Sequence, residues 1–266
     1  MTRISEPNPA PFSSNEWNDY WNRLTANEPL STDSRMAAQL CNILSVENRL
    51  VLEMGAGFGT DGLSLMKESA FVVFVDFAFS SLALIKNRMD NPPFPFMGVC
   101  ADVTNLPFRN TVFDAVMHQG LMEHFPDPEQ MLSESRRILK PGGTSIIDVP
   151  QKFHPYTLFK HVCMEFGLWN MGWETEYTPR QLAHLMEKSG FSIKVMYGTW
   201  SRPSLLYRLF RELLRSLGIR LPLKPPRLPL LSKVRKRIAA LLLKHPWALW
   251  TVMDIGVAAC KPDDAG

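Results

Sequence analysis

From Leu50 onward, the hydrophobic positions of the chain follow two alternating patterns. Short runs of aliphatic, β-branched or aromatic residues are separated by longer stretches in which apolar residues recur every three or four positions. The first pattern is typical of buried parallel strands and the second of amphipathic helices. Together they predict a doubly wound α/β fold, a sheet with helices on both faces. The predicted strands are Leu50–Met54, Phe71–Asp76, Phe94–Cys100, Val112–His118, Gly143–Val149, Phe191–Thr199 and Thr251–Cys260.

Helix ends are marked by residues that do not continue a helix. Lys140-Pro141-Gly142-Gly143 ends one helical segment and Ser189-Gly190 ends another. The predicted core helices are Asp61–Ser69, Phe79–Met89, Pro128–Leu139 and Thr178–Lys188.

Two further helices precede the first strand, Glu16–Leu24 and Asp33–Leu44. The first carries Trp17, Tyr20 and Trp21, so these helices could close over a ligand. We therefore expect one domain made of four parts: a helical cap over 1–48, the core over 49–200, a helical insertion over 201–250, and the last strand over 251–261.

The composition indicates the size of the core, the partners that are not required and the expected location, but it does not indicate a function. A chain of 266 residues with 45% hydrophobic content can bury one substantial core, and its net charge of +3 does not require nucleic acid or membrane as partner. The cysteines, Cys41, Cys100, Cys163 and Cys260, stand singly, which predicts buried thiols in a reducing cytosol. Residues 1–14 lack the apolar stretch of a secretory signal, and no apolar run could span a bilayer. We expect a cytoplasmic protein, at most peripheral to a membrane.

A glycine-rich turn follows the first predicted strand, in the sequence Glu53-Met54-Gly55-Ala56-Gly57-Phe58-Gly59. Glycine between a strand and a helix removes the Cβ that would keep a ligand from the backbone. Nicotinamide dehydrogenases use GxGxxG at this place to bind a pyrophosphate. Here the spacing is GxGxG with an acid before it, which favours a ligand that ends in a zwitterionic amino acid.

Acids also end the next two strands. Asp76 lies where a carboxylate could accept hydrogen bonds from two ribose hydroxyls, and Phe77 could cover a purine face. Asp102 could accept from an adenine amino group, although an isolated Asp at a strand end is more often a helix cap. Asp76 alone suits either class of nucleotide cofactor.

The order of five motifs resembles class I S-adenosylmethionine-dependent methyltransferases, in particular the group acting on small molecules, quinones, sterols and lipids. After the glycine turn come Asp102-Val103 with Leu106-Pro107-Phe108, then Phe113-Asp114-Ala115-Val116, Glu123-His124-Phe125-Pro126-Asp127-Pro128 and Leu139-Lys140-Pro141-Gly142-Gly143. The resemblance covers roughly Leu50 to Val149, and five elements in order are more specific than any one.

The resemblance implies a fold, a cofactor and a set of binding residues. The fold is a Rossmann-like seven-stranded sheet whose last strand is antiparallel, and the cofactor is S-adenosylmethionine, leaving as S-adenosylhomocysteine, with no metal. Glu53 and Gly55-Ala56-Gly57 would hold the methionine part and Asp76 the ribose. The adenine would contact Phe77, Asp102 and Val103, and the reactive end would contact His118, Gln119 and Gly120.

Methyl transfer is an in-line displacement, so the protein mainly aligns the acceptor and excludes water, and a base is optional. For a hydroxyl or carbon acid, His118 and His154 are the candidate catalytic bases. A solvent-exposed loop residue is an equally open interpretation of His154. His124 belongs to a segment that the family has across different acceptors, so we expect it to be structural.

The acceptor is expected to be a small or lipid-like molecule. Candidate substrate contacts are Tyr20, Trp21, Tyr156, Trp169 and Trp173. For Trp169 and Trp173, core packing is the competing explanation. Asn91-Pro92-Pro93-Phe94 resembles a nucleobase-methylating motif but precedes the third strand instead of following the fourth. Methylation of a nucleobase amino group is therefore disfavoured.

The segment from Arg202 to Lys244 concentrates positive charge. It contains twelve Lys and Arg residues and one acid, so it carries +11 while the rest of the chain carries −8. Two basic amphipathic helices, one over 205–217 and one over Ser232–His245, precede Trp247 and Trp250, which suits the headgroup region of an anionic membrane. Packing of both helices on the sheet or over the active site is equally open, and RNA is disfavoured because few aromatic residues alternate with the arginines.

Two other functions remain as alternatives to a small-molecule methyltransferase. One is a catalytically silent adaptor that presents the basic helices to a membrane or protein partner, since a fold does not guarantee its chemistry. The other is a macromolecular methyltransferase acting on RNA or protein.

Overall fold

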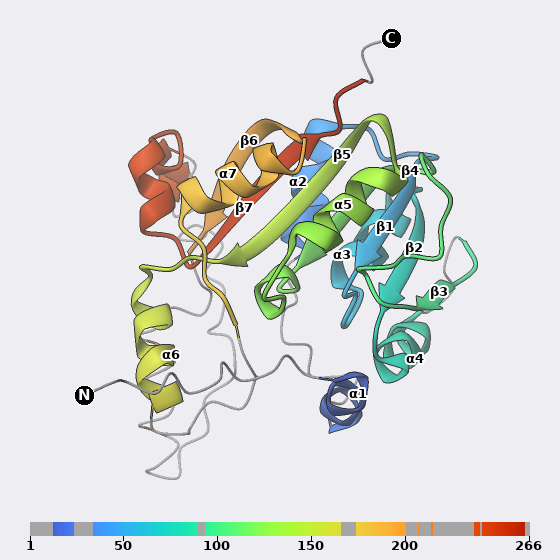
Figure 1. Ribbon diagram of the computed structural model, residues 1–266, viewed down its shortest axis with the longest axis horizontal. Helices are drawn as coiled ribbons and strands as arrows, with labels where there is room; N and C mark the ends of the chain where they lie inside the picture. Colours follow the sequence, from blue (N-terminus) through green and yellow to red (C-terminus); the bar gives the residue numbers. More distant parts are fainter. Residues whose placement is uncertain are drawn as a thin grey trace.

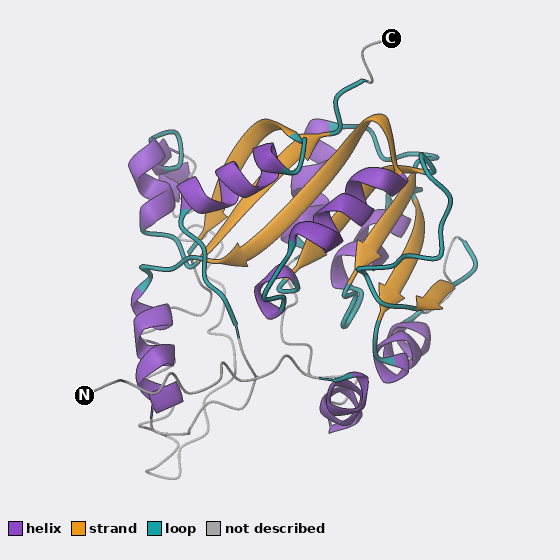
Figure 2. Ribbon diagram, viewed as in Figure 1, coloured by secondary structure: helices purple, strands orange, loops and turns teal. Residues whose placement is uncertain are grey.

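A mixed seven-stranded sheet forms the centre of the computed structural model and lies between two layers of helices (Figures 1 and 2). The strand order is β3-β2-β1-β4-β5-β7-β6. The structure describes residues 13–23, 34–89, 94–165, 174–200, 207, 214, 237–239 and 241–263. The strands are β1 (Leu50–Met54), β2 (Phe71–Asp76), β3 (Met97–Cys100), β4 (Phe113–Gln119), β5 (Leu139–Pro150), β6 (Ser192–Thr199) and β7 (Asp254–Cys260). The helices are α1 (Ser14–Arg23), α2 (Arg35–Ile43), α3 (Thr60–Lys67), α4 (Phe79–Arg88), α5 (Glu129–Ile138), α6 (Pro155–Glu165) and α7 (Pro179–Lys188), with 3₁₀ turns η1 (Met122–His124) and η2 (Pro246–Trp250).

The predicted topology is confirmed. Strands β1 to β5 are parallel, and β7 runs antiparallel between β5 and β6. The predicted bounds of β1 and β2 match the observed ones, because these strands are buried on both faces and are continuously apolar. β5 begins four residues earlier than predicted: Leu139 already pairs with Phe113, and the register shifts before Ala115 pairs with Thr144.

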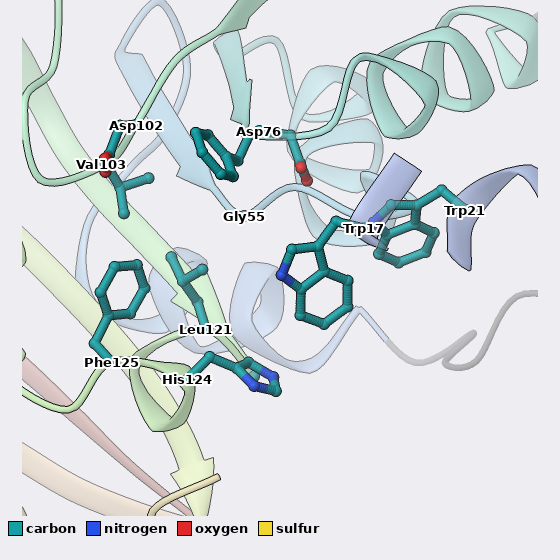
Figure 3. Close-up of a pocket in the computed structure, with 11 residues that line it drawn as sticks. Trp17, Trp21, Gly55, Asp76, Asp102, Val103, Leu121, His124 and Phe125 are labelled. Atoms are coloured by element: carbon teal, nitrogen blue, oxygen red, sulfur yellow. The ribbon is translucent and has the colours of Figure 1, made fainter. Parts of the chain in front are cut away.

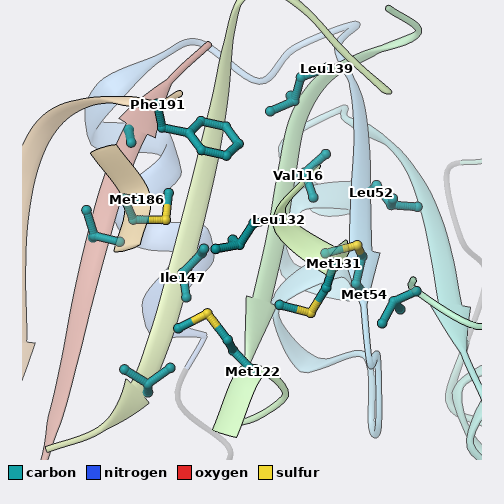
Figure 4. Close-up of a cluster of buried hydrophobic side chains, with 14 of the residues drawn as sticks. Leu52, Met54, Val116, Met122, Met131, Leu132, Leu139, Ile147, Met186 and Phe191 are labelled. Atoms are coloured by element: carbon teal, nitrogen blue, oxygen red, sulfur yellow. The ribbon is translucent and has the colours of Figure 1, made fainter. Parts of the chain in front are cut away.

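Each face of the sheet buries its own apolar cluster. Side chains of α2, α3 and α4 pack with one face, through residues such as Leu40, Leu65 and Ile85. Side chains of α5 and α7 pack with the other, where Leu132 and Met186 contribute to the cluster in Figure 4. The two layers hold the strands so that their carboxyl ends meet at one edge of the sheet.

The two N-terminal helices differ in depth. In α2, Met36, Ala37 and Leu40 are buried, whereas α1 buries none of its residues. α1 is held beside the start of α4, where the Asn18 Oδ1 accepts from Ser80 N at 3.0 Å and from Ser80 Oγ at 2.9 Å.

The sequence pattern did not predict helix α6, which follows β5. His154 caps it, since its Nδ1 accepts from the Tyr156 backbone N–H at 3.1 Å, and the ring of Phe153 stacks on Trp250 of η2. Most of the basic insertion lies outside the described residues, although residues 237–239 and 241–242 within the second predicted basic helix are helical. The division into cap, core and insertion stays a prediction. No helix within the described residues has the length and hydropathy needed to span a bilayer.

Candidate functional site

A cavity of about 250 Å³ opens at the carboxyl edge of the parallel strands. Residues from the ends of β1, β2, β3 and β4 form one wall, and α1 and η1 form the other. Figure 3 shows Asp102 and Val103 at one end, the α1 tryptophans at the other, and Leu121 between them. The lining residues are Trp17, Trp21, Gly55, Asp76, Phe77, Asp102, Val103, Gly120, Leu121, His124 and Phe125.

The glycine turn has the backbone that its sequence predicts. Gly55 and Gly57 have φ of +57° and +52°, a region that L side chains rarely adopt. A Cβ on Gly55 would lie 2.7 Å from Leu121 Cδ1, and a Cβ on Gly57 would lie 2.9 Å from the Trp21 ring. The absence of a side chain at both positions is what allows the two walls of the cavity to approach the turn.

Asp76 is buried at the end of β2, and its carboxylate is held by three donors. Its Oδ2 accepts from Gly57 N at 3.0 Å and from Ser81 Oγ at 2.9 Å, and its Oδ1 accepts from Ala78 N at 2.9 Å. Burial raises the pKa of Asp76, and the two backbone N–H donors and the hydroxyl oppose that rise. The carboxylate is thereby fixed in orientation at the cavity wall.

Glu53 lies beneath the glycine turn and does not line the cavity. Its Oε2 accepts from Gly62 N at 2.9 Å. Burial, reinforced by the nearby Asp61 carboxylate, raises the pKa of Glu53 well above its ordinary value. Glu53 is therefore the carboxyl group of this region that would gain most from a cation placed beside it.

Asp102 has two roles in the structure. Its Oδ1 accepts from the backbone N–H and from the hydroxyl of Thr104, both at 2.8 Å. These bonds stabilise a turn; the helix-cap alternative is wrong, because no helix begins in the described residues between β3 and β4. It also lines the cavity together with the buried Val103.

The remaining predicted cofactor contacts divide into two groups. Gly120 lines the cavity with φ of +64°. Ala56 is buried and its N–H donates to Val75 O at 3.1 Å, and neither it nor Gln119 is among the lining residues.

His118 is not brought to the cavity. Its side chain is 1% exposed within β4, neither ring nitrogen has a hydrogen-bond partner among the described residues, and burial lowers its pKa to about 3. His154 is a helix cap, burial lowers its pKa, and neither it nor Tyr156 lines the cavity.

Of the predicted substrate contacts, some lie at the cavity and others do not. Trp21 lines the cavity, whereas Tyr20 stands behind it, in edge-to-face contact with Trp17 and Trp21. Trp169 and Trp173 lie outside the described residues.

Residues that the sequence did not assign complete the second wall. His124 lines the cavity in edge-to-face contact with Trp17, with ring centroids 5.2 Å apart, and Leu121 and Phe125 lie on either side of it in sequence. The sequence offered a signal for Trp17, in its cluster with Tyr20 and Trp21. For His124 it offered none, because the shared Glu-His-Phe segment looked structural.

Among the described residues, no group of three or more His, Cys, Asp or Glu side chains could hold a metal ion.

Most of the residues that line the cavity lie within a segment that matches a known family. Residues 52–147 match the family model described as a methyltransferase domain. The chain is 28% identical over 144 residues to the ubiquinone biosynthesis O-methyltransferase of Coxiella burnetii, covering 53% of this chain and 62% of that protein. It is 34% identical over 108 residues to the demethylmenaquinone methyltransferase of Clavibacter sepedonicus, covering 40% of this chain and 42% of that one. The chain thus spans less than two thirds of either relative.

A solved structure shares the fold over nearly the whole chain. It is the methyltransferase in the complex with the Trm112 methyltransferase activator of Haloferax volcanii. The TM-score is 0.65, the identity is 16%, and the match covers 96% of this chain and 100% of the other.

Proposed function

We propose that this chain, which belongs to the class I S-adenosylmethionine-dependent methyltransferases, transfers a methyl group from S-adenosylmethionine to a small acceptor with an apolar body. One observation carries the proposal. Gly55, Asp76, Asp102 and Gly120, from four different loops, line one cavity in the order that the family motifs require, and an aromatic wall closes the opposite side.

The residues present fit this cofactor. Asp76 offers a fixed carboxylate for two ribose hydroxyls, and the missing Cβ atoms of Gly55 and Gly57 leave the backbone open to an amino-acid end. Phe77 and Val103 provide apolar faces for a purine. The buried carboxyl of Glu53 suits an ammonium group, since a cation there would offset part of its desolvation. When bound, S-adenosylmethionine supplies a methyl group on a positively charged sulfur, ready for in-line displacement.

On the acceptor side we assign the proton-accepting role to His124 instead of His118 or His154. His124 faces the cavity, and its imidazole can take the proton of an acceptor hydroxyl while the oxygen lone pair forms the bond to the methyl carbon. His118 is buried within the sheet, and the side chain of His154 caps α6. Trp17 orients the His124 ring and, with Phe125, excludes water from the reacting atoms.

The acceptor class follows from the wall and from the relatives. Trp17, Leu121 and Phe125 suit a flat or aliphatic molecule, and the two relatives are named for ubiquinone and demethylmenaquinone. We propose a hydroxylated ring with an apolar substituent. A cytoplasmic location, with contact to an anionic membrane through the basic segment 202–245, is consistent with such an acceptor and remains part of the proposal.

Calorimetric titration of the purified chain with S-adenosylmethionine and S-adenosylhomocysteine tests the cofactor assignment. We expect Asp76→Ala to weaken both affinities by about tenfold to a hundredfold, because it removes a charged acceptor worth about 1.5–3 kcal/mol. Gly55→Val should abolish binding, because its side chain would enter the space of Leu121. The exposed Asp19→Ala is the matched control and should bind normally.

Thermal melting of each variant separates loss of binding from loss of folding. A folded wild-type chain that binds neither compound would overturn the assignment and favour the silent adaptor. Given binding, transfer of radiolabelled methyl to catechols that carry or lack an alkyl chain tests the acceptor class. A preference for the chain-free catechol contradicts the apolar-substituent proposal.

A further inference from the structure

Helix α6 exposes two apolar side chains and buries two polar ones. Leu158 and Val162, one helical turn apart, are exposed, whereas Thr157 and Lys160 are buried. The Lys160 Nζ forms ion pairs with Glu174, at 2.8 Å, and with Glu176. A helix that faces water usually does the reverse, burying its apolar stripe and solvating its lysines. The outer face of α6 is therefore suited to an apolar environment.

A second segment extends this face. Residues 237–250 expose Ile238, Leu241 and Trp247, and η2 meets the start of α6 where the ring of Phe153 stacks on Trp250 with centroids 6.0 Å apart. Five of the nine large apolar side chains that are exposed among the described residues belong to these two segments, and Phe153, two residues before α6, is a sixth; their exposed fractions are 52% to 59%. We call them the α6–η2 surface: Phe153, Leu158, Val162, Ile238, Leu241 and Trp247.

Cations border the α6–η2 surface. Lys152, Arg237 and Lys244 are exposed next to its apolar residues in sequence, and the Arg180 guanidinium lies 5.9 Å from the ring centroid of Trp250. One exposed acid, Glu165, stands at the end of α6. Apolar and tryptophan side chains flanked by lysine and arginine match the interface of an anionic bilayer, where the apolar groups enter the acyl boundary and the cations meet lipid phosphates.

The surface also lies at the edge of the sheet that holds the cavity. α6 follows the carboxyl end of β5, the same edge at which Gly55, Asp76 and Gly120 line the cavity, and Figure 1 shows α6 and the last residues before β7 along one side of the molecule. A membrane docked on this surface would lie at the same edge of the sheet as the cavity.

We infer that the α6–η2 surface docks on an anionic membrane. The inference rests on α6, η2 and their charges, and it holds whether or not the chain transfers methyl groups. It goes beyond the basic segment, because α6 lies outside that segment and, together with Phe153 just before it, contributes half of the apolar residues.

Sedimentation of the full chain with vesicles tests the inference. The vesicles are phosphatidylcholine alone and phosphatidylcholine mixed with phosphatidylglycerol. Wild type should sediment with the mixed vesicles and not with pure phosphatidylcholine. Leu158→Asp with Val162→Asp should reduce binding by at least about tenfold, because two apolar side chains no longer enter the bilayer. Val195→Asp, at an exposed apolar position on β6, is the control and should bind as wild type does.

The contribution of positive charge to membrane binding is tested with two double variants, one on the α6–η2 surface and one away from it. Arg237→Glu with Lys244→Glu should reduce binding by roughly tenfold or more, since each cation near an anionic surface contributes about 1 kcal/mol. Lys67→Glu with Lys86→Glu makes the same change in net charge on exposed positions of α3 and α4, away from this surface. An equal loss in both pairs would show attraction by net charge alone and overturn the inference.

Two further results would also overturn it. One is a wild-type chain that does not sediment with anionic vesicles, which is the result expected if the basic insertion covers this face. The other is a dimer that Leu158→Asp with Val162→Asp dissociates without affecting vesicle binding, which would make the face a contact between two copies. Titration of the same samples with S-adenosylhomocysteine keeps the proposals apart, because cofactor binding without vesicle binding rejects only the membrane surface.

Discussion

The helices α1 and α2 come from one N-terminal segment with similar amphipathic patterns, yet they belong to different parts of the molecule. α2 is part of the core: Arg35 Nε lies 2.6 Å from Asp148 and its Nη1 lies 2.8 Å from Asp254, and Ala37 N donates to Asp61 at 2.8 Å. α1 buries no residue and is held by the contacts of Asn18 with Ser80.

The two helices therefore have different roles: α2 is anchored in the core, and α1 provides a wall of the cavity. Because α2 is tied to β5, β7 and α3 by charge and burial, it cannot move without exposing acids that are otherwise compensated. α1 places Trp17 and Trp21 on the cavity and buries none of its own residues. The expected effects on stability are accordingly larger for changes at α2 than for changes at α1.

Replacing Arg35 with Met should have the largest effect. The change leaves Asp148 and Asp254 buried without their cation, which typically costs about 3–5 kcal/mol of unfolding free energy. Urea denaturation measures it. Arg49→Met removes the ion pair of an exposed arginine with Asp114 and should cost about 1 kcal/mol or less. Similar losses in the two variants would contradict the anchoring role of α2.

Replacing His124 with Ala should lower the rate of methyl transfer on the order of 100-fold, because the acceptor loses its proton acceptor. The affinity for S-adenosylhomocysteine should stay unchanged, which distinguishes a reacting group from a structural one. Steady-state rates and calorimetry measure the two quantities. His124→Gln, which keeps much of the volume and the contact with Trp17, should be equally slow. Recovery of the rate in His124→Gln would assign the residue a packing role instead.

The buried His118 should make the stability of the native state depend on pH. Its native pKa of about 3 lies below its ordinary value of 6.5, so between these values the unfolded state binds more protons and native stability falls as the pH drops. From pH 7 to pH 5 this amounts to about 2 kcal/mol.

Thermal melting of His118→Leu checks this value. The variant should lose less stability than wild type from pH 7 to pH 5, with His184→Leu, at an exposed position of α7, as the control. Parallel pH profiles for wild type and His118→Leu would place the histidine in contact with water and reopen a catalytic role for it.

The smallest effect is expected at the α1 contact. Asn18→Ala removes the acceptor of two hydrogen bonds from Ser80 and should cost about 1 kcal/mol or less of global stability. It should nevertheless speed amide hydrogen exchange in α1 severalfold, because these hydrogen bonds fix α1 beside α4 and the helix buries none of its own residues. Asn22→Ala, at an exposed position of the same helix, is the control. Unchanged exchange in Asn18→Ala would show that the aromatic contacts alone hold α1.

Local chemistry explains why much of the cofactor half was predictable. Gly55, Asp76, Asp102 and Gly120 each stand within two residues of a predicted strand end, and parallel strands bring their carboxyl ends together in any fold of this class. The acceptor half was not predictable in this way. His118 and His124 are six residues apart, yet His118 is buried within β4, whereas His124 follows that strand in the 3₁₀ turn η1 and faces the cavity.

The sequence by itself determined the doubly wound α/β sheet and the resemblance to a methyltransferase family, and that resemblance supplied the antiparallel last strand, because buried strands and glycine turns impose local requirements on residue type. Only the tertiary structure decided that α2 is core and α1 a wall, that His124 faces the cavity, and that α6 turns leucine and valine outward over a buried lysine. These outcomes depend on contacts between distant segments, Asn18 with Ser80, Trp17 with His124 and Lys160 with Glu174, which no local pattern encodes.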